Sequence, residues 1–182
     1  MSHLTGKTVA FLATDGFEDS ELTGPWEAVT GHGATAVLVS SESGTITGKN
    51  GHEARVDRTT ADADASTFDA LVLPGGVTNG DTIRTDVDAV RFTRAFFEQH
   101  KPVGVICHGG WILTDADVLR GRTLTSYPSL RTDLTNAGAT WVDEEVVVDA
   151  GLVSSRVPDD LPAFNAKLVE EIEEGQHTGQ TA

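Results

Sequence analysis

The sequence predicts an α/β protein with a mostly parallel sheet and helices on both faces. Short apolar runs rich in Val, Leu and Ala are spaced along the chain, as buried strands are. Longer segments with helical periodicity lie between them. Gly-rich turns close several of the apolar runs. Strands that alternate with helices form a parallel sheet whose two faces are both covered, and ligands bind beyond the carboxyl ends of its strands.

The amino-terminal half supplies the first of these alternating elements. The helix after the first strand carries Leu22, Trp26 and Val29 at helical spacing, with Pro25 near its first turns. Segment 44–57 is rich in Gly, Thr and charge, which predicts short antiparallel strands or a long excursion. The strands predicted in this half cover residues 7–13, 35–40 and 69–73.

The carboxyl-terminal half continues the alternation. Thr85-Asp86-Val87-Asp88 resembles a capping box and predicts a helix start, with Asp in place of the usual Glu or Gln. We expect helices over 85–100, from Cys107 through 113, over 129–137 and from about 160, and strands over 101–106, 141–142, 146–148 and 152–155. The polar segment 175–182 is expected to fray. Residues 1–182 are expected to form a single domain.

Composition narrows the classes of partner. The formal net charge is −15, with 28 acidic and 13 basic residues, and only Lys7, Lys49, Lys101 and Lys167 are lysines. Nucleic acids and anionic membranes bind basic surfaces, so neither is an expected partner. The acid excess predicts a salt-adapted protein. We also expect a cytoplasmic location, because there is no apolar span, no signal peptide and only one cysteine.

That cysteine, Cys107, lies where a nucleophile is expected. It ends the apolar run Val103-Gly104-Val105-Ile106 and precedes His108-Gly109-Gly110. A side chain at a sharp strand-to-helix turn is lifted out of the sheet toward a cleft. A helix N-terminus and an adjacent imidazole both lower the pKa of a thiol. A buried structural cysteine is the alternative, but this context favours a functional one.

Two further loops are expected beside Cys107. Residues 14–19 leave the first strand and carry carboxylates, and Pro74-Gly75-Gly76 leaves the strand before that of Cys107. The backbone N–H groups of this Gly-Gly turn and of the residue after Cys107 can stabilise an oxyanion. Together these loops supply a nucleophile, a base, a carboxylate and an anion hole, which is the set needed for covalent carbonyl chemistry.

The same residues carry a resemblance to a known family. The motifs Gly16-Phe17-Glu18-Asp19-Ser20-Glu21-Leu22, Gly48-Lys49-Asn50-Gly51, Leu73-Pro74-Gly75-Gly76, Val105-Ile106-Cys107-His108-Gly109 and Val157-Pro158-Asp159-Asp160-Leu161 stand in collinear order. With them the chain resembles the PfpI family of intracellular cysteine proteases and deglycases, in the class I glutamine-amidotransferase-like superfamily. The resemblance covers nearly the whole chain. It implies a flavodoxin-like three-layer sandwich and a homodimer or a hexamer of dimers.

The resemblance also implies roles for individual residues. Cys107 would be the nucleophile with Glu18 against its sulfur, and His108 would be its histidine partner. The N–H groups of Gly76 and His108 would form the oxyanion hole. Protease-like members complete a triad with a glutamate that follows the Pro-Gly-Gly turn of a neighbouring subunit. The nearest acid here is Asp81, which is one methylene shorter, so it either orients His108 or caps the following helix.

The pocket is expected to include Gly75, Trp111 and Tyr127. Trp111 either walls the cleft or packs in the core, and the Tyr127 hydroxyl faces either the site or solvent. The other histidines (His3, His32, His52, His100 and His177) have no ligand spacing. We therefore expect no obligatory metal and no other cofactor.

Three functions remain open. The first is a cofactor-independent enzyme in which Cys107 attacks reactive carbonyls, as a glutathione-independent glyoxalase or a deglycase of glycated substrates. The second is a cysteine peptidase that uses the same thiol on peptides. The third is a redox sensor or chaperone without turnover, because an accessible thiolate oxidises readily.

Overall fold

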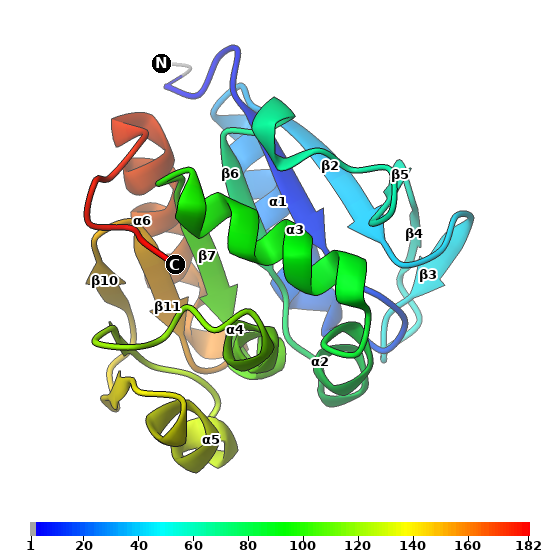
Figure 1. Cartoon of the computed structure of the whole chain (residues 1–182). Coiled ribbons are helices and arrows are strands. Elements are labelled where there is room, and N and C mark those ends of the chain that lie inside the picture. Colours follow the sequence, from blue (N-terminus) through cyan, green and yellow to red (C-terminus); the bar gives the residue numbers. More distant parts are fainter. Residues whose placement is uncertain (1–2) are drawn as a thin grey trace.

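A seven-stranded sheet forms the centre of the computed structural model, which describes residues 3–182 (Figure 1). Its strands, in chain order, are β1 (Thr8–Leu12), β2 (Thr35–Ser40), β5 (Arg58–Thr59), β6 (Ala70–Leu73), β7 (Val103–Ile106), β10 (Val147–Asp149) and β11 (Leu152–Ser155). The spatial order is β10-β11-β7-β6-β1-β2-β5. Every neighbouring pair is parallel except β10 and β11. The predicted, mostly parallel sheet is confirmed.

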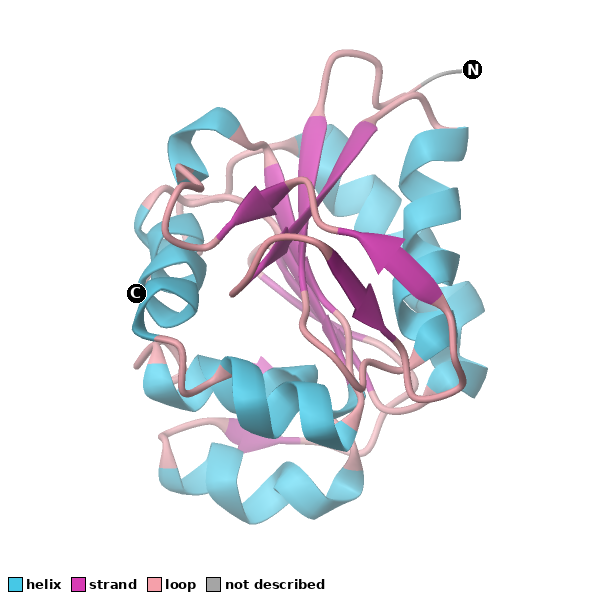
Figure 2. Ribbon diagram, turned by 90° about the vertical axis from the view of Figure 1, so that its right-hand side faces the viewer, coloured by secondary structure: helices cyan, strands magenta, loops and turns pink. Residues whose placement is uncertain are grey.

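Helices cover both faces of this sheet (Figure 2). The helices are α1 (Asp19–Gly31), α2 (Val77–Ile83), α3 (Val87–Glu98), α4 (Trp111–Asp115), α5 (Arg131–Asn136) and α6 (Leu161–Glu174). Leu22 and Val29 of α1 share one core cluster with Phe164 of α6. On the other face, Phe92 of α3 and Ile112 of α4 belong to a second cluster. The sheet therefore separates two hydrophobic cores, as the sequence pattern indicates.

Helix α3 shows how local sequence sets an element. The Asp86 side chain accepts a hydrogen bond from the N–H of Asp88 at 2.9 Å, so Asp86 is the N-cap. Such a cap satisfies one of the unpaired N–H groups of the first turn. The predicted helix is confirmed, but it begins at Val87, and Asp86 caps it in place of Thr85 of the predicted capping box.

The remaining elements are two short two-stranded sheets and four 3₁₀ turns within residues 3–182. They are the antiparallel pair β3 (Thr45–Thr47) and β4 (Glu53–Arg55), the parallel pair β8 (Thr123–Leu124) and β9 (Thr140–Trp141), and the 3₁₀ turns η1 (Ala65–Thr67), η2 (Cys107–Gly110), η3 (Pro128–Leu130) and η4 (Pro158–Asp160). The β3–β4 hairpin confirms the predicted antiparallel strands. The Asp19 carboxylate holds the intervening turn, because it accepts hydrogen bonds from the N–H groups of Asn50 and His52.

The carboxyl-terminal segment differs from expectation. Residues 175–182 are polar and were expected to fray, but they dock beside the start of β7. The N–H of His177 donates to the carbonyl of His100 at 2.8 Å, and Gln180 is 0% exposed. The Gln180 amide also donates to the carbonyl of Lys101. Backbone and amide hydrogen bonds hold this segment where apolar burial is scarce.

Within residues 3–182, no helix has both the length and the apolar character needed to cross a bilayer.

Candidate active site

Cys107 lies at a strained turn directly after β7. Its φ is 59°, in the left-handed region that non-glycine residues rarely adopt. Such a backbone costs about 1–3 kcal/mol and persists where the surrounding structure fixes it. A Cβ at Gly109 would lie 2.8 Å from the carbonyl oxygen of Pro74, so glycine is needed for this close approach. The turn has the elbow geometry that the sequence predicts.

Two backbone N–H groups meet at the Cys107 sulfur. They belong to Gly76 and His108, and both lower the pKa of the thiol by hydrogen bonding. Gly76 has a φ of 95° and is the N-cap of α2, so its conformation suits glycine. The two donors expected at an oxyanion hole are thus brought together at the reactive atom.

The carboxyl group against the sulfur belongs to Glu21. Its Oε2 accepts a hydrogen bond from the N–H of Gly75 at 2.8 Å, and the carboxyl couples to the Cys107 sulfur through charge and a hydrogen bond. Glu21 is 0% exposed, and its Oε1 has no aligned hydrogen-bond partner. A Cβ at Gly75 would lie 2.7 Å from the Cβ of Cys107 and overlap the Glu21 carboxylate. Gly75 therefore lies between the two groups but, contrary to the prediction, it is not among the residues that line the cavity.

The expectation for Glu18 is corrected by this placement. Glu18 is the N-cap residue of α1, with an extended backbone, and its carboxylate forms an ion pair with Lys49. Glu21 lies within the first helical turn, on the face that buries Leu22, Pro25 and Val29. Helical side chains lean toward the helix N-terminus, which directs Glu21 to the edge of the sheet where Cys107 lies. Glu18 still lines the same cavity, at its entrance.

Burial sets the charge state of the pair. It raises the pKa of the Glu21 carboxyl to about 8, and the nearby Glu18 charge adds to this effect. Burial, followed by the Glu21 charge, raises the pKa of the Cys107 thiol to about 12. The expectation of a lowered thiol pKa is therefore wrong, because burial and Glu21 outweigh the two N–H donors. At neutral pH Glu21 holds a proton beside the sulfur.

His108 is a neutral base in contact with the thiol. Its Nδ1 lies 3.2 Å from Cys107 Sγ, and its Nε2 lies 3.4 Å from Ser129 Oγ. Burial lowers the pKa of the imidazole, and the Lys49 charge lowers it further. This environment favours a tautomer with the proton on Nε2, so that Nδ1 can accept the thiol proton. His108 therefore does not supply the positive charge that would lower the thiol pKa.

Two aromatic side chains hold the His108 ring. Tyr127 stacks on it with 4.5 Å between ring centroids, and Trp111 meets it edge-to-face at 5.2 Å. Tyr127 lines the cavity. The Trp111 indole N–H donates to Asp133. Trp111 thus positions His108 and is not part of the lining.

Asp81 lies apart from the other predicted residues. It is exposed on α2, and among residues 3–182 no hydrogen bond or ion pair joins it to His108. Asp86 is the residue that caps α3, so the capping alternative for Asp81 is wrong. Within one chain, then, the thiol and the imidazole form a dyad.

Asn79 was missed by the sequence analysis. Its amide donates to the carbonyls of Pro74 and Gly75, and its carbonyl accepts from the N–H of Thr14. It is 1% exposed. Asn79 therefore ties together two of the three loops that form the site. A polar residue three positions after the Gly-Gly turn is the sequence signal that points to it.

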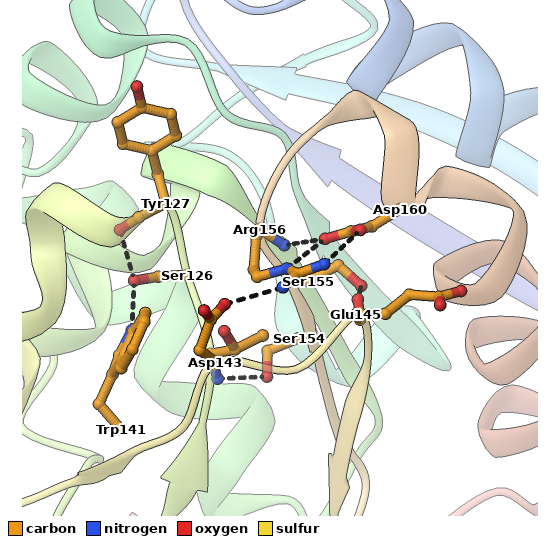
Figure 3. Close-up of polar contacts among 10 residues, drawn as sticks. Ser126, Tyr127, Trp141, Asp143, Glu145, Ser154, Ser155, Arg156 and Asp160 are labelled. Atoms are coloured by element: carbon orange, nitrogen blue, oxygen red, sulfur yellow. Dashed lines mark hydrogen bonds and ion pairs between the residues drawn. The ribbon is translucent and has the colours of Figure 1, made fainter.

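The cavity in front of the sulfur has a volume of about 220 Å³. It is lined by Glu18, Glu21, Lys49, Gly76, Val77, Cys107, His108, Tyr127, Val157 and Pro158. Figure 3 shows polar contacts beside two of the lining residues: Trp141 donates to Ser126, which precedes Tyr127, and Arg156, which precedes Val157, pairs with Asp143 and Asp160. The small volume suits a substrate of a few heavy atoms.

Fold and site together define a flavodoxin-like α/β protein with a cysteine at a nucleophile elbow. The DJ-1/PfpI family model matches residues 7–171, and the chain belongs to this family.

Named relatives are similar over most of the chain. The putative cysteine protease YraA of Bacillus subtilis is 48% identical over 160 residues, covering 87% of this chain and 94% of the relative. The deglycase PH1704 of Pyrococcus horikoshii is 48% identical over 161 residues, covering 88% and 96%.

A solved structure agrees in fold. It is a two-domain protein from Anabaena variabilis with DJ-1/ThiJ/PfpI-like and ferritin-like domains, with a TM-score of 0.89 and 37% identity. The match covers 91% of this chain and 48% of that one, so the chain spans about half of the two-domain protein.

Proposed function

We propose that this protein is a cofactor-independent cysteine enzyme that converts small reactive carbonyls, such as methylglyoxal, to hydroxy acids. Deglycation of early glycation adducts would follow from the same chemistry. The observation that carries the proposal is a buried thiol between an acid and a base. Glu21 holds a proton, His108 is neutral, and both contact Cys107 in a cavity of about 220 Å³. The deglycase name of a relative that is 48% identical agrees with it.

The first step would be addition to the aldehyde. His108 Nδ1 takes the thiol proton as sulfur bonds to the aldehyde carbon, and the oxygen that gains charge meets the N–H groups of Gly76 and His108. Protonation of that oxygen gives a hemithioacetal.

The later steps would move one proton. A base removes the hydrogen from the former aldehyde carbon while the neighbouring carbonyl oxygen gains a proton, which gives an enediol. Protonation of the second carbon, with loss of the hydroxyl proton from the sulfur-bearing carbon, then gives a lactoyl thioester. Glu21 suits this exchange, because a carboxyl with a pKa of about 8 can both give and accept a proton near neutral pH. Water hydrolyses the thioester to lactate and the thiol, so the sum is methylglyoxal plus water to lactate.

The test is lactate formation from methylglyoxal without glutathione, at high salt, for wild type and Cys107→Ala. We expect steady turnover by wild type and a loss of at least about 10³-fold in the variant. Equal lactate formation by the two proteins would overturn the proposal, as would no lactate from folded wild type.

Peptide hydrolysis is a second candidate. The 3.2 Å contact between Cys107 Sγ and His108 Nδ1 is what an acyl-enzyme mechanism needs, and one relative is named a putative cysteine protease. Because Asp81 is exposed, it could complete a triad only for a neighbouring copy. Hydrolysis of a fluorogenic peptide that exceeds lactate formation, and is lost in Cys107→Ser, would favour this candidate.

A further inference from the structure

A second cluster of titratable side chains lies where α6 ends and the docked tail begins. Glu171 and Glu174 are on the last turn of α6, and His177 follows on the tail. One ligand atom from each lies within 4.8 Å of the other two. His177 Nε2 is 3.2 Å from Glu171 Oε2 and 3.9 Å from Glu174 Oε2. His177 has no ligand spacing in the sequence, and the docked tail brings it to the end of α6.

Two atoms of this cluster are buried without an aligned hydrogen bond. Glu171 is 7% exposed, and its Oε2 makes no hydrogen bond. His177 Nε2 also makes none, although it lies close to that oxygen. A buried polar atom without a hydrogen bond carries a desolvation cost. The two atoms lie 3.2 Å apart, so one ligand placed between them could contact both.

The surroundings favour a cation. The C-terminal end of a helix carries a partial negative charge, and the last turn of α6 has no basic residue. Glu170 and Glu173 also lie at this end, where Lys167 and His3 pair with them, so Glu171 and Glu174 are the carboxylates that face His177. A bound cation would offset this accumulation of negative charge.

The donor set indicates which cation. Zn²⁺ binds imidazole nitrogen and carboxylate oxygen at about 2.0–2.2 Å, which places neighbouring tetrahedral ligands about 3.4 Å apart. The contacts of 3.2 and 3.9 Å lie around this separation. The imidazole disfavours Mg²⁺ and Ca²⁺, which prefer oxygen ligands alone.

The His177 ring is also held in position. A Cβ at Gly151 would lie 2.9 Å from His177 Cδ2, so the ring rests on the turn between β10 and β11. The backbone N–H of His177 is fixed to His100. A preorganised ligand loses less freedom when it binds.

From these observations we propose that Glu171, Glu174 and His177 form a Zn²⁺ site, with water completing the coordination, that fastens the carboxyl-terminal tail to α6. The family match ends at residue 171, so Glu174 and His177 lie beyond it. The site is separate from Cys107 and is independent of the carbonyl chemistry.

The experiment is a calorimetric titration of the full chain with Zn²⁺ in a Cys107→Ser background, which removes the only thiol. We expect one Zn²⁺ to bind per chain. Glu171→Gln and His177→Gln should each weaken binding by more than about tenfold. Glu173→Gln is the matched control, because it makes the same charge change on an α6 residue that pairs with His3 instead. Its affinity should match that of the background protein.

Hydrogen exchange of the tail provides a second readout. Zn²⁺ should slow amide exchange over 175–180 in the Cys107→Ser protein and leave it unchanged in Cys107→Ser with His177→Gln. His177 lies on the tail, so its replacement tests the site even where Glu171→Gln fails to fold. No Zn²⁺ binding by the Cys107→Ser protein would overturn the proposal and leave a histidine–carboxylate ion pair only. Unchanged affinity in His177→Gln would also overturn it.

Discussion

A buried glutamate from a neighbouring helix lies near each end of strand β7. Glu21 lies at its carboxyl end beside Cys107, and Glu171 lies at its amino end, where the tail docks against His100. Burial raises the pKa of both carboxyls, and each has an oxygen without an aligned hydrogen bond. Each also lies in a cluster that contains a histidine. In both regions a buried carboxyl group lacks part of its hydrogen bonding, which costs free energy.

The groups that surround each glutamate determine the chemistry that it can support. Glu21 faces a thiol and a Gly-Gly turn, in which the N–H of Gly75 donates to Glu21 and the N–H of Gly76 to the Cys107 sulfur. This arrangement suits covalent chemistry on a carbonyl. Glu171 faces a second carboxylate and a ring nitrogen, which are cation ligands. The role of a buried carboxyl group therefore depends on the donors and acceptors that surround it.

The largest expected effect distinguishes Glu21 of α1 from Glu18, the N-cap residue of that helix. Glu21→Gln keeps the shape and a hydrogen-bond donor but removes the proton carrier, so kcat for lactate formation should fall by about 10²–10⁴-fold. Glu18→Gln is the control at the cavity entrance and should change kcat by less than about tenfold. A larger loss in Glu18→Gln than in Glu21→Gln would return the central role to Glu18.

The next effect concerns Gly75, which lies between Glu21 and Cys107. In Gly75→Ala, the new methyl group would lie 2.7 Å from Cys107 Cβ, so we expect a loss of about 1–3 kcal/mol in the free energy of unfolding, together with loss of turnover. Gly31→Ala is the control, since nothing lies within 4 Å of a Cβ there. Urea unfolding measures both variants. Full stability and activity in Gly75→Ala would contradict the packing described here.

The pH dependence of stability tests the charge state of Glu21. Its pKa is about 8 when folded, against an ordinary value of 4.5. Between these values the unfolded chain releases a proton that the folded protein keeps, so stability falls as pH rises. Relative to Glu21→Gln, wild type should lose a few kcal/mol between about pH 5 and pH 8. Parallel stability curves for the two proteins would show that Glu21 titrates normally.

The smallest effect tests the separation of the two regions. Glu171→Gln lies at the opposite end of β7 from Cys107, so lactate formation should stay within about twofold of wild type. A large loss of turnover in a folded Glu171→Gln protein would mean that the two ends are coupled.

Much of this arrangement is predictable from sequence. Apolar runs such as Val103-Gly104-Val105-Ile106 predict the strands, and the elbow at Cys107 follows from the Gly-rich turn after it. Gly76 and His108 reach their predicted places because both follow directly from neighbouring parallel strands. These features depend on local pattern and on the topology of parallel sheets.

The remaining features depend on burial and long-range contacts. Glu18 and Glu21 are equally plausible in the sequence, although Glu21, Pro25 and Val29 share one buried face at intervals of four. That spacing could have identified Glu21. The raised thiol pKa follows from this same buried carboxyl. The docking of the tail depends on single hydrogen bonds of His177 and Gln180, which composition does not reveal.

The central claim is that the titrations of Glu21 and Cys107 are coupled, because the two buried groups lie side by side. The rate of Cys107 alkylation by iodoacetamide, followed against pH in wild type and Glu21→Gln, tests it without any assumed substrate. We expect two rises in wild type, the first near pH 8, because loss of one proton from the pair creates some thiolate. Glu21→Gln should show a single rise. Identical profiles for the two proteins would contradict the account.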